Sequence, residues 1–189
     1  MTRPITQAVA MKGIVFNLLE EIVVREHGDD TWDALLDAAG VDGVYTSLGN
    51  YPDADLMALV GAASQALALP ADDIVRWYGR NALPLLAERY PAFFAPHSDA
   101  RAFVLTLNEI IHPEVRKLYP GALTPAFAFD ASQPGRLVMD YRSERRLCAF
   151  AEGLLLGAGD HFGQQVEIAQ SECMHRGDER CLIEIGFSS

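Results

Sequence analysis

The spacing of apolar residues changes once along the chain, near Thr124, and no other feature limits the fold as strongly. Before Thr124, apolar side chains recur every three or four residues, which is typical of amphipathic helices. After it, apolar and polar residues alternate, as at Phe127 and Phe129, which is typical of half-buried strands. The sequence therefore predicts an α+β fold, with an N-terminal helical lobe followed by a lobe of antiparallel sheet and helices.

Helices are predicted wherever the apolar period is three to four. They are expected at residues 12–25, 31–39, 55–69 and 74–89. The first half of the chain is therefore expected to be all helix. Ser98 is the expected N-cap of a fifth helix, which ends at Pro120-Gly121. We expect this helix to kink or restart at His112, because Pro113 disfavours helical geometry in the residue before it.

The remaining sequence predicts two hairpins separated by a helix. The strand that carries Phe127 and Phe129 would turn at Pro134-Gly135 and return over residues 137–141. The helix is expected at residues 143–160, and the last two strands at about residues 165–173 and 180–187.

Length and composition are those of one folded domain. The chain has 189 residues, of which 50% are hydrophobic and 22% charged, so it can bury a core large enough to hide a ligand. We expect residues 1–10 to be an N-terminal extension and residues 11–187 to form a single domain. The helical part is expected at about residues 11–120, and the mixed α/β part at about residues 121–187.

The charge and the N-terminus exclude several classes of partner. A formal net charge of −11 argues against binding to nucleic acid or anionic lipid, because both depend on basic patches. No apolar run approaches the ~18 residues that span a bilayer, and the N-terminus lacks the pattern of a secretory signal. We therefore expect a cytoplasmic protein that binds neither nucleic acid nor membrane.

Two sets of polar residues could carry chemistry. His112 lies beside the apolar stripe of its helix, where a neutral imidazole can ligate haem iron, although a hydrogen-bonded structural histidine would give the same pattern. Tyr141, Ser143 and Arg145 offer two hydroxyls and a guanidinium that suit carboxylates or phosphates. The alternative for this set is a helix N-cap at Ser143 with solvated arginines.

Three cysteines form the third set. Cys173 and Cys181 are separated by seven residues that would form a turn, so they could face each other across two strands. With Cys148 they make an odd number in a chain without an export signal, which favours buried thiols or a metal or redox site over a disulfide framework.

Together these motifs resemble the haem nitric oxide/oxygen binding (H-NOX) family, whose members include the N-terminal domain of soluble guanylate cyclase. The similarity runs from Met11-Lys12-Gly13 through Phe187. His112, followed by Leu118-Tyr119-Pro120-Gly121-Ala122 and Pro125, matches the histidine, glycine and proline of the family. The Tyr-x-Ser-x-Arg motif of the family matches Tyr141, Ser143 and Arg145.

The resemblance implies a haem b buried between the two lobes. His112 would be the axial ligand of the iron, and the Tyr-x-Ser-x-Arg motif would bind the propionates. Val15, Leu19, Phe150 and Leu154 would line the haem pocket, and Pro125 would press on the porphyrin. Core packing is the alternative for each of these apolar residues. The absence of a Cys-x-x-Cys-His sequence agrees with non-covalent haem.

The gaseous ligand is inferred from Phe150. Oxygen-binding members of the family have a tyrosine that donates a hydrogen bond to oxygen, and this position is Phe150 here. Bound oxygen is partly negative and needs such a donor, whereas NO binds iron strongly without one. The resemblance therefore implies binding of NO and CO, but no stable binding of oxygen.

Some members of the family also bind zinc through three cysteines and a histidine. Cys148, Cys173 and Cys181 fit this pattern, but Gln170 replaces the histidine. Tetrahedral zinc would need His175, His161 or a water instead. The alternative is three reduced, half-buried thiols.

The expected function is a non-enzymatic gas sensor. No output domain follows the last strand, so the signal would pass to a separate protein, such as a histidine kinase or a cyclic-dinucleotide enzyme. The main alternative is a cysteine- or zinc-based redox switch, or a ligand-binding domain of the 4-vinyl reductase type, which the Cys173–Cys181 segment resembles. That alternative explains neither His112 nor the Tyr-x-Ser-x-Arg motif. Peroxidase chemistry is a third option, but the sequence shows no distal acid-base pair.

Overall fold

The computed structural model describes residues 10–188, which divide into two compact units at Leu69 and Pro70. The predicted N-terminal extension, residues 1–10, lies outside the described residues apart from Ala10. No single described helix is long and apolar enough to cross a bilayer. Among the described helices, one bent pair, Asp53–Leu67 with Ala71–Arg89, meets the length and composition criteria when the two are taken together.

The N-terminal unit contains three helices and a two-stranded ribbon. Its elements are β1 (Ala10–Lys12), α1 (Gly13–His27), α2 (Asp29–Ala39), β2 (Asn50–Pro52) and α3 (Asp53–Leu67). The prediction of an all-helical first half is therefore wrong in one detail, because β1 and β2 pair antiparallel. Gly13 allows the chain before β2 to approach α1 closely, since a Cβ atom on Gly13 would lie 1.9 Å from the Thr46 carbonyl oxygen.

The C-terminal unit combines a four-stranded sheet with helices. Its helical segments are α4 (Ala71–Arg89), α5 (Pro91–Phe94), α6 (Ala100–Leu105), the π-helical turn η1 (Leu107–Ile111), α7 (His112–Leu118), α8 (Cys148–Phe162) and the 3₁₀ turn η2 (Met174–Arg176). Its strands are β3 (Ala126–Asp130), β4 (Arg136–Arg142), β5 (Gln165–Glu172) and β6 (Cys181–Ser188). All neighbouring strands are antiparallel, in the order β3-β4-β6-β5, which confirms the α+β fold and both predicted hairpins.

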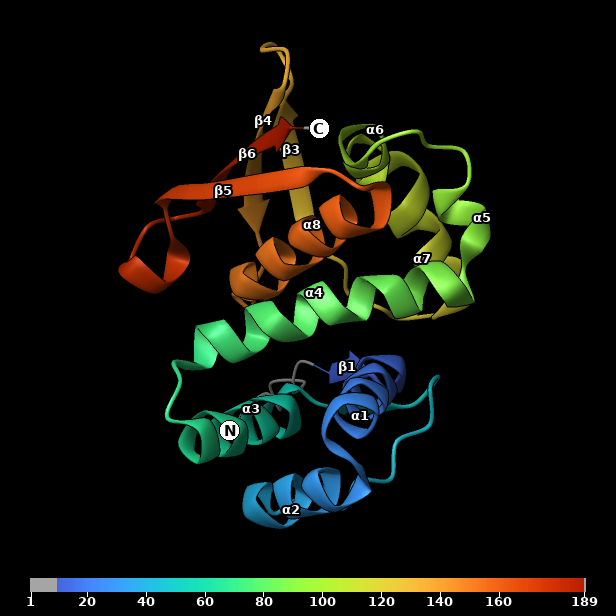
Figure 1. The fold of residues 1–189 in the computed structure, drawn as a ribbon, viewed down its shortest axis with the longest axis vertical. Helices are drawn as coiled ribbons and strands as arrows, with labels where there is room; N and C mark the ends of the chain where they lie inside the picture. The colour runs from blue at the N-terminus through green and yellow to red at the C-terminus, as the bar shows by residue number, and fades with distance from the viewer. Residues whose placement is uncertain (1–9, 189) are drawn as a thin grey trace, which may run out of the picture. The chain divides into compact units, whose positions relative to one another are not determined.

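One face of the sheet forms the core. Alternate residues of β4, namely Leu137, Met139 and Tyr141, are buried, and Met139 is paired with Phe129 on β3 and with Ile183 on β6. Helix α8 crosses this face, and α4 packs on the other side of α8 (Figure 1). The alternating period predicted this burial, because successive side chains of a strand point to opposite faces.

Helices α4 and α8 approach each other closely because glycines lie where they cross. A Cβ atom on Gly153 of α8 would lie 2.2 Å from the carbonyl oxygen of Arg76 on α4. Beside this crossing, Arg76 Nε donates a 2.9 Å hydrogen bond to the buried carboxylate of Glu152.

Two predicted helix starts are wrong. The N-cap of α6 is Asp99 and not Ser98, because the Asp99 carboxylate accepts a 2.8 Å hydrogen bond from the Ala102 N–H. Helix α8 begins at Cys148 and not at residue 143, because the preceding residues form a turn in which Arg146 has a φ of 52°, a left-handed conformation that ends helical geometry.

Candidate functional site

His112 is the first residue of α7 and directly follows a π-helical turn. The predicted break in the fifth helix is therefore confirmed: α6, η1 and α7 are separate segments. The His112 N–H still belongs to the π turn, because it donates to the Leu107 carbonyl. His112 itself has helical angles (φ −64°, ψ −39°) although a proline follows. Such π turns occur frequently at functional sites.

The imidazole of His112 is held neutral by its surroundings. Burial, with a smaller contribution from the positive charge of Arg116, lowers its pKa from 6.5 to about 4. In the described part of the chain its ring nitrogens form no hydrogen bond, and its one ring contact is with Phe127, at 5.2 Å between centroids. A neutral imidazole with an unbonded nitrogen is the state that a metal ion requires.

Phe127 connects His112 to the Tyr-x-Ser-x-Arg motif. Its ring centroid lies 5.8 Å from that of Tyr141, which is its partner across strands β3 and β4. Burial raises the pKa of Tyr141 to about 12, against the effect of hydrogen bonds from Ser143 and the Leu147 backbone. The Tyr141 hydroxyl therefore stays protonated at neutral pH and remains a hydrogen-bond donor.

The other two residues of the motif lie in the turn after β4. The Ser143 hydroxyl accepts a 3.3 Å hydrogen bond from the Arg145 N–H. The guanidinium of Arg145 donates a 2.8 Å hydrogen bond from Nη1 to the Leu123 carbonyl, two residues before Pro125. The motif is thus joined to the segment that leads from α7 into β3.

The predicted pocket residues divide between the two units. Pro125, Phe150 and Leu154 are half-buried in the C-terminal unit, where the Phe150 ring packs 4.9 Å from that of Tyr78. Val15 is half-buried and Leu19 is buried, both on α1 of the N-terminal unit.

The three cysteines form one buried cluster, as their sequence spacing predicted for Cys173 and Cys181. Cys173 Sγ lies 3.9 Å from Cys148 Sγ and 4.0 Å from Cys181 Sγ, and all three sulfur atoms lie within 4.8 Å of one another. Burial raises the pKa of Cys148 to about 12 and also raises that of Cys181. The thiols of Cys148 and Cys181 are therefore protonated at neutral pH.

Neither histidine considered as a fourth ligand belongs to this cluster. His175 lies on η2, between Cys173 and Cys181, but its Nε2 atom is 2.6 Å from the Arg146 carbonyl oxygen. His161 lies near the far end of α8, about 20 Å along the helix axis from Cys148. Gln170 lies closer: its side chain interacts with Cys148, and its buried Nε2 atom has no hydrogen-bond partner among residues 10–188.

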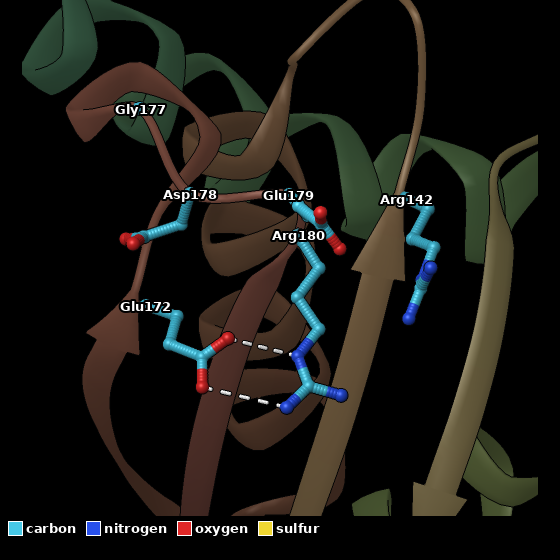
Figure 2. A pocket seen from close by; sticks show the side chains of 6 residues that line it. All are labelled: Arg142, Glu172, Gly177, Asp178, Glu179 and Arg180. Carbon is cyan, nitrogen blue, oxygen red and sulfur yellow. Dashed lines mark hydrogen bonds and ion pairs between the residues drawn. The ribbon is translucent and has the colours of Figure 1, made fainter.

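A polar hollow on the sheet contains none of the predicted site residues. Arg142, Glu172, Arg180 and the residues 177–179 line it (Figure 2). Both of its arginines are paired: Arg180 with Glu172 and Asp140, at 2.8 and 2.9 Å, and Arg142 with Asp140, at 3.2 Å. Its arginines are thus already paired with carboxylates of strands β4 and β5.

Sequence reasoning missed two residues of the site. Phe127 was identified only as a strand residue, although its ring contacts His112. Asn108, on η1, donates a 2.7 Å hydrogen bond from its amide to the Phe127 carbonyl. An asparagine four residues before a histidine is too common to signal a site, and the contact joins residues 19 positions apart.

These residues fit a haem. A neutral nitrogen donor on α7 suits the iron, and the hydroxyls of Tyr141 and Ser143 with the guanidinium of Arg145 suit two propionates. Phe127 lies between the two groups and offers an apolar ring to a flat apolar macrocycle.

Comparison with known families assigns the chain to a family of haem proteins. A model of the family described as Haem-NO-binding matches residues 12–170. The chain therefore belongs to the H-NOX family of haem domains that bind nitric oxide.

Solved structures of H-NOX proteins have the same fold. One is the crystal structure of an H-NOX protein from S. oneidensis in the Fe(II)NO ligation state, with 36% identity and a TM-score of 0.89 over 95% of this chain and 100% of that one. An NMR structure of an H-NOX domain from Shewanella oneidensis in the Fe(II)CO state has 35% identity and a TM-score of 0.86, over 95% and 99% of the chains. The unliganded Fe(II) H-NOX protein from K. algicida has 27% identity and a TM-score of 0.84, over 95% and 97%.

A more distant similarity is to soluble guanylate cyclase gcy-32 of Caenorhabditis elegans. The two sequences are 30% identical over 71 residues, which are 36% of this chain and 10% of the cyclase. The aligned part thus spans about a tenth of that enzyme.

Proposed function

We propose that this protein is a haem-based sensor in which His112 holds the iron of a haem b and nitric oxide is the signal. The observation that carries the proposal is the His112 imidazole, which is neutral, half-buried and without a hydrogen bond in the described residues. Haem, when bound, supplies the iron at which NO binds. Membership of the Haem-NO-binding family supports this assignment.

The remaining site residues hold the haem. Tyr141, Ser143 and Arg145 would bind the propionates through two hydroxyl groups and a guanidinium, which form stronger hydrogen bonds with carboxylates than with neutral acceptors. Pro125, Phe150 and Leu154 would contribute apolar contacts from the C-terminal unit, and Val15 and Leu19 from the N-terminal unit. Residues 11–187 would then act as a single haem domain.

The choice of gas follows from Phe150. At this position oxygen-binding members of the family have a donor, but the Phe150 ring has none, so it cannot stabilise a partly negative oxygen ligand. We therefore expect NO and CO to bind, and oxygen to bind poorly. Relatives have been solved in Fe(II)NO and Fe(II)CO states.

The signal would be a movement of α7. Release of His112 from the iron would free the start of this helix, and NO would shift the protein to the released arrangement only if it binds that arrangement more tightly. A sensor of this kind acts without catalysis and needs a partner to read the movement. We propose a histidine kinase or a cyclic-dinucleotide enzyme as that partner.

We propose zinc as the occupant of the cysteine cluster, with a water as the fourth ligand. The sulfur separations of 3.9 and 4.0 Å suit tetrahedral zinc with bonds of about 2.3 Å. The rival function, a redox switch, is less well supported, because it explains neither His112 nor the Tyr-x-Ser-x-Arg motif. Native mass spectrometry of protein never exposed to chelator tests the zinc proposal, which absence of zinc would contradict.

The absorption spectrum of purified, reduced, haem-loaded protein tests the main proposal. Under argon we expect the spectrum of five-coordinate ferrous haem, with no change on admission of air and a shift on addition of NO. Stable oxygen binding would contradict the assigned gas, and failure to take up haem would favour the cysteine-based alternative.

A further inference from the structure

Asn108 joins the helical segment before His112 to the sheet. It is the second residue of η1, and its amide Nδ2 donates a 2.7 Å hydrogen bond to the backbone carbonyl of Phe127. Phe127 belongs to β3, one of the two edge strands of its sheet. One half-buried side chain thus anchors the π turn to a strand 19 residues further along the chain.

The anchored residue is the one whose ring contacts the imidazole. Phe127 accepts the Asn108 hydrogen bond with its carbonyl and places its ring centroid 5.2 Å from that of His112. Phe127 therefore fixes two things at once: where η1 lies on β3, and where the His112 imidazole lies.

The π turn makes this anchor important for the direction in which His112 points. The Ile111 N–H bonds to the Thr106 carbonyl at 3.1 Å and the His112 N–H to Leu107, five residues back in each case. An α-helical turn contains one residue fewer than the π turn, and each residue turns a helix by about 100°. If an α-helical turn replaced η1, α7 would therefore be rotated by about 100° about the helix axis. The imidazole would then leave the face that Phe127 occupies.

We propose that Asn108 is a positioning residue, which holds the π turn in register on β3 and so aims the His112 imidazole at the haem iron. This inference depends on the proposed function, because it assigns Asn108 a role through the axial histidine. It predicts that loss of the Asn108 amide donor changes the iron–histidine bond in a protein that still folds and still binds haem.

The test is resonance Raman spectroscopy of the reduced, haem-loaded protein and of its Asn108→Ala and Asn108→Asp variants. Asn108→Asp keeps the size of the side chain but removes the donor. In both variants we expect the iron–histidine stretching band to broaden and move to lower frequency, and the haem dissociation rate to rise about fivefold, the ratio that corresponds to one ordinary hydrogen bond.

Asn81→Ala is the matched control. Asn81 Nδ2 donates a 2.9 Å hydrogen bond to the Trp77 carbonyl on α4, so this variant also loses a bond from an asparagine to the backbone. We expect its Raman band to match that of the unaltered protein. A band unchanged in the Asn108 variants, or loss of fold in both while Asn81→Ala stays folded, would overturn the proposal.

A second variant protein distinguishes positioning of His112 by Asn108 from a general loosening of the haem pocket. In His112→Ala protein with added imidazole, the axial ligand is no longer attached to α7, so Asn108→Ala should change neither the iron–imidazole band nor the haem dissociation rate. A fivefold faster dissociation in this background as well would show a structural role and contradict the proposal. Failure of the unaltered protein to bind haem would instead contradict the proposed function.

Discussion

At the scale of single residues, the site depends on burial more than on sequence neighbours. His112 and Tyr141 are moved in opposite pKa directions by the same cause, since burial disfavours the imidazolium and the phenolate alike. The neutral forms that result are the ones that a haem needs, an unprotonated nitrogen for iron and a hydroxyl donor for a carboxylate.

The pH dependence of the haem-free protein should reveal the buried imidazole. Between pH 6.5 and about 4 the unfolded chain carries more protons on His112 than the folded chain does. The free energy of unfolding should therefore fall as the pH falls through this range, by at most about 3 kcal/mol. NMR titration of His112 and urea unfolding at several pH values measure both effects. His112→Leu should show a flatter dependence, and a His112 pKa near 6.5 would contradict the expectation.

Arg145→Ala should weaken haem binding. A charge-assisted hydrogen bond contributes about 1.5–3 kcal/mol, so the haem dissociation rate should rise about tenfold or more. The transfer of haem to apomyoglobin measures this rate. Arg142→Ala is the control, because Arg142 belongs to the same sequence segment but is exposed and paired with Asp140. Equal rates in the two variants would remove Arg145 from the propionate site.

Phe150→Tyr should add a hydrogen-bond donor at the position that selects the gas. We expect this variant to bind oxygen measurably, with NO binding retained, because oxygen gains a donor and NO does not need one. Absorption spectra recorded during oxygen titration measure the effect. Phe150→Leu, which removes the ring without adding a donor, should gain no oxygen affinity. Higher oxygen affinity in Phe150→Leu and none in Phe150→Tyr would contradict the role given to the donor.

At the scale of elements, two irregular features position the site. The π turn η1 sets the direction of α7, and the turn after β4 places Ser143 and Arg145 beside Tyr141 instead of within α8. The glycines at the α4–α8 crossing let these two helices lie close together.

Gly153→Ala should destabilise the protein through that crossing. The added Cβ would meet the Arg76 carbonyl oxygen at 2.2 Å, and backbone atoms cannot rotate away, so we expect the free energy of unfolding to fall by about 1–3 kcal/mol or more. Gly61→Ala in α3 is the control, because, apart from neighbouring atoms of its own helix, no atom of the described residues lies within 4 Å of its added Cβ. It should be neutral or stabilising by up to about 1 kcal/mol. Urea unfolding measures the free energy of unfolding of both variants. Equal values for Gly153→Ala and Gly61→Ala would mean that α4 and α8 can move apart at no cost in stability.

At the scale of the whole molecule, haem should act as a stabilising ligand. A ligand present at a hundred times its Kd adds about 2.7 kcal/mol to the free energy of unfolding, which for a chain of this size corresponds to roughly 5–10 °C in Tm. Calorimetry of protein with and without haem should show this difference. His112→Ala should lose most of this Tm difference and regain part of it when imidazole is added. A Tm that does not depend on haem would contradict the expectation that haem stabilises the folded protein.

The sequence by itself determined most of the elements and their order, but not the short β1–β2 ribbon. The change of period at Thr124, the break at His112-Pro113 and the hairpin at Pro134-Gly135 depend on residues within one turn or one strand of each other, so local spacing is enough to predict them. The motif residues of the site were also visible, although their roles came from the family resemblance. The helix starts at residues 98 and 143 failed because two neighbouring residues can compete for a cap, and the left-handed Arg146 has no sequence signal.

Only the tertiary structure decided which of these residues meet. The contacts of Phe127 with His112 and with Asn108, and that of Cys148 with Cys173, each join separate elements of the fold. The same holds for the neutral imidazole, because its pKa is lowered by burial and burial is produced by the packing of several elements at once. Spacing predicts contacts within a hairpin, such as Cys173 with Cys181, but not contacts between separate elements, because the packing of the elements fixes the distances between them.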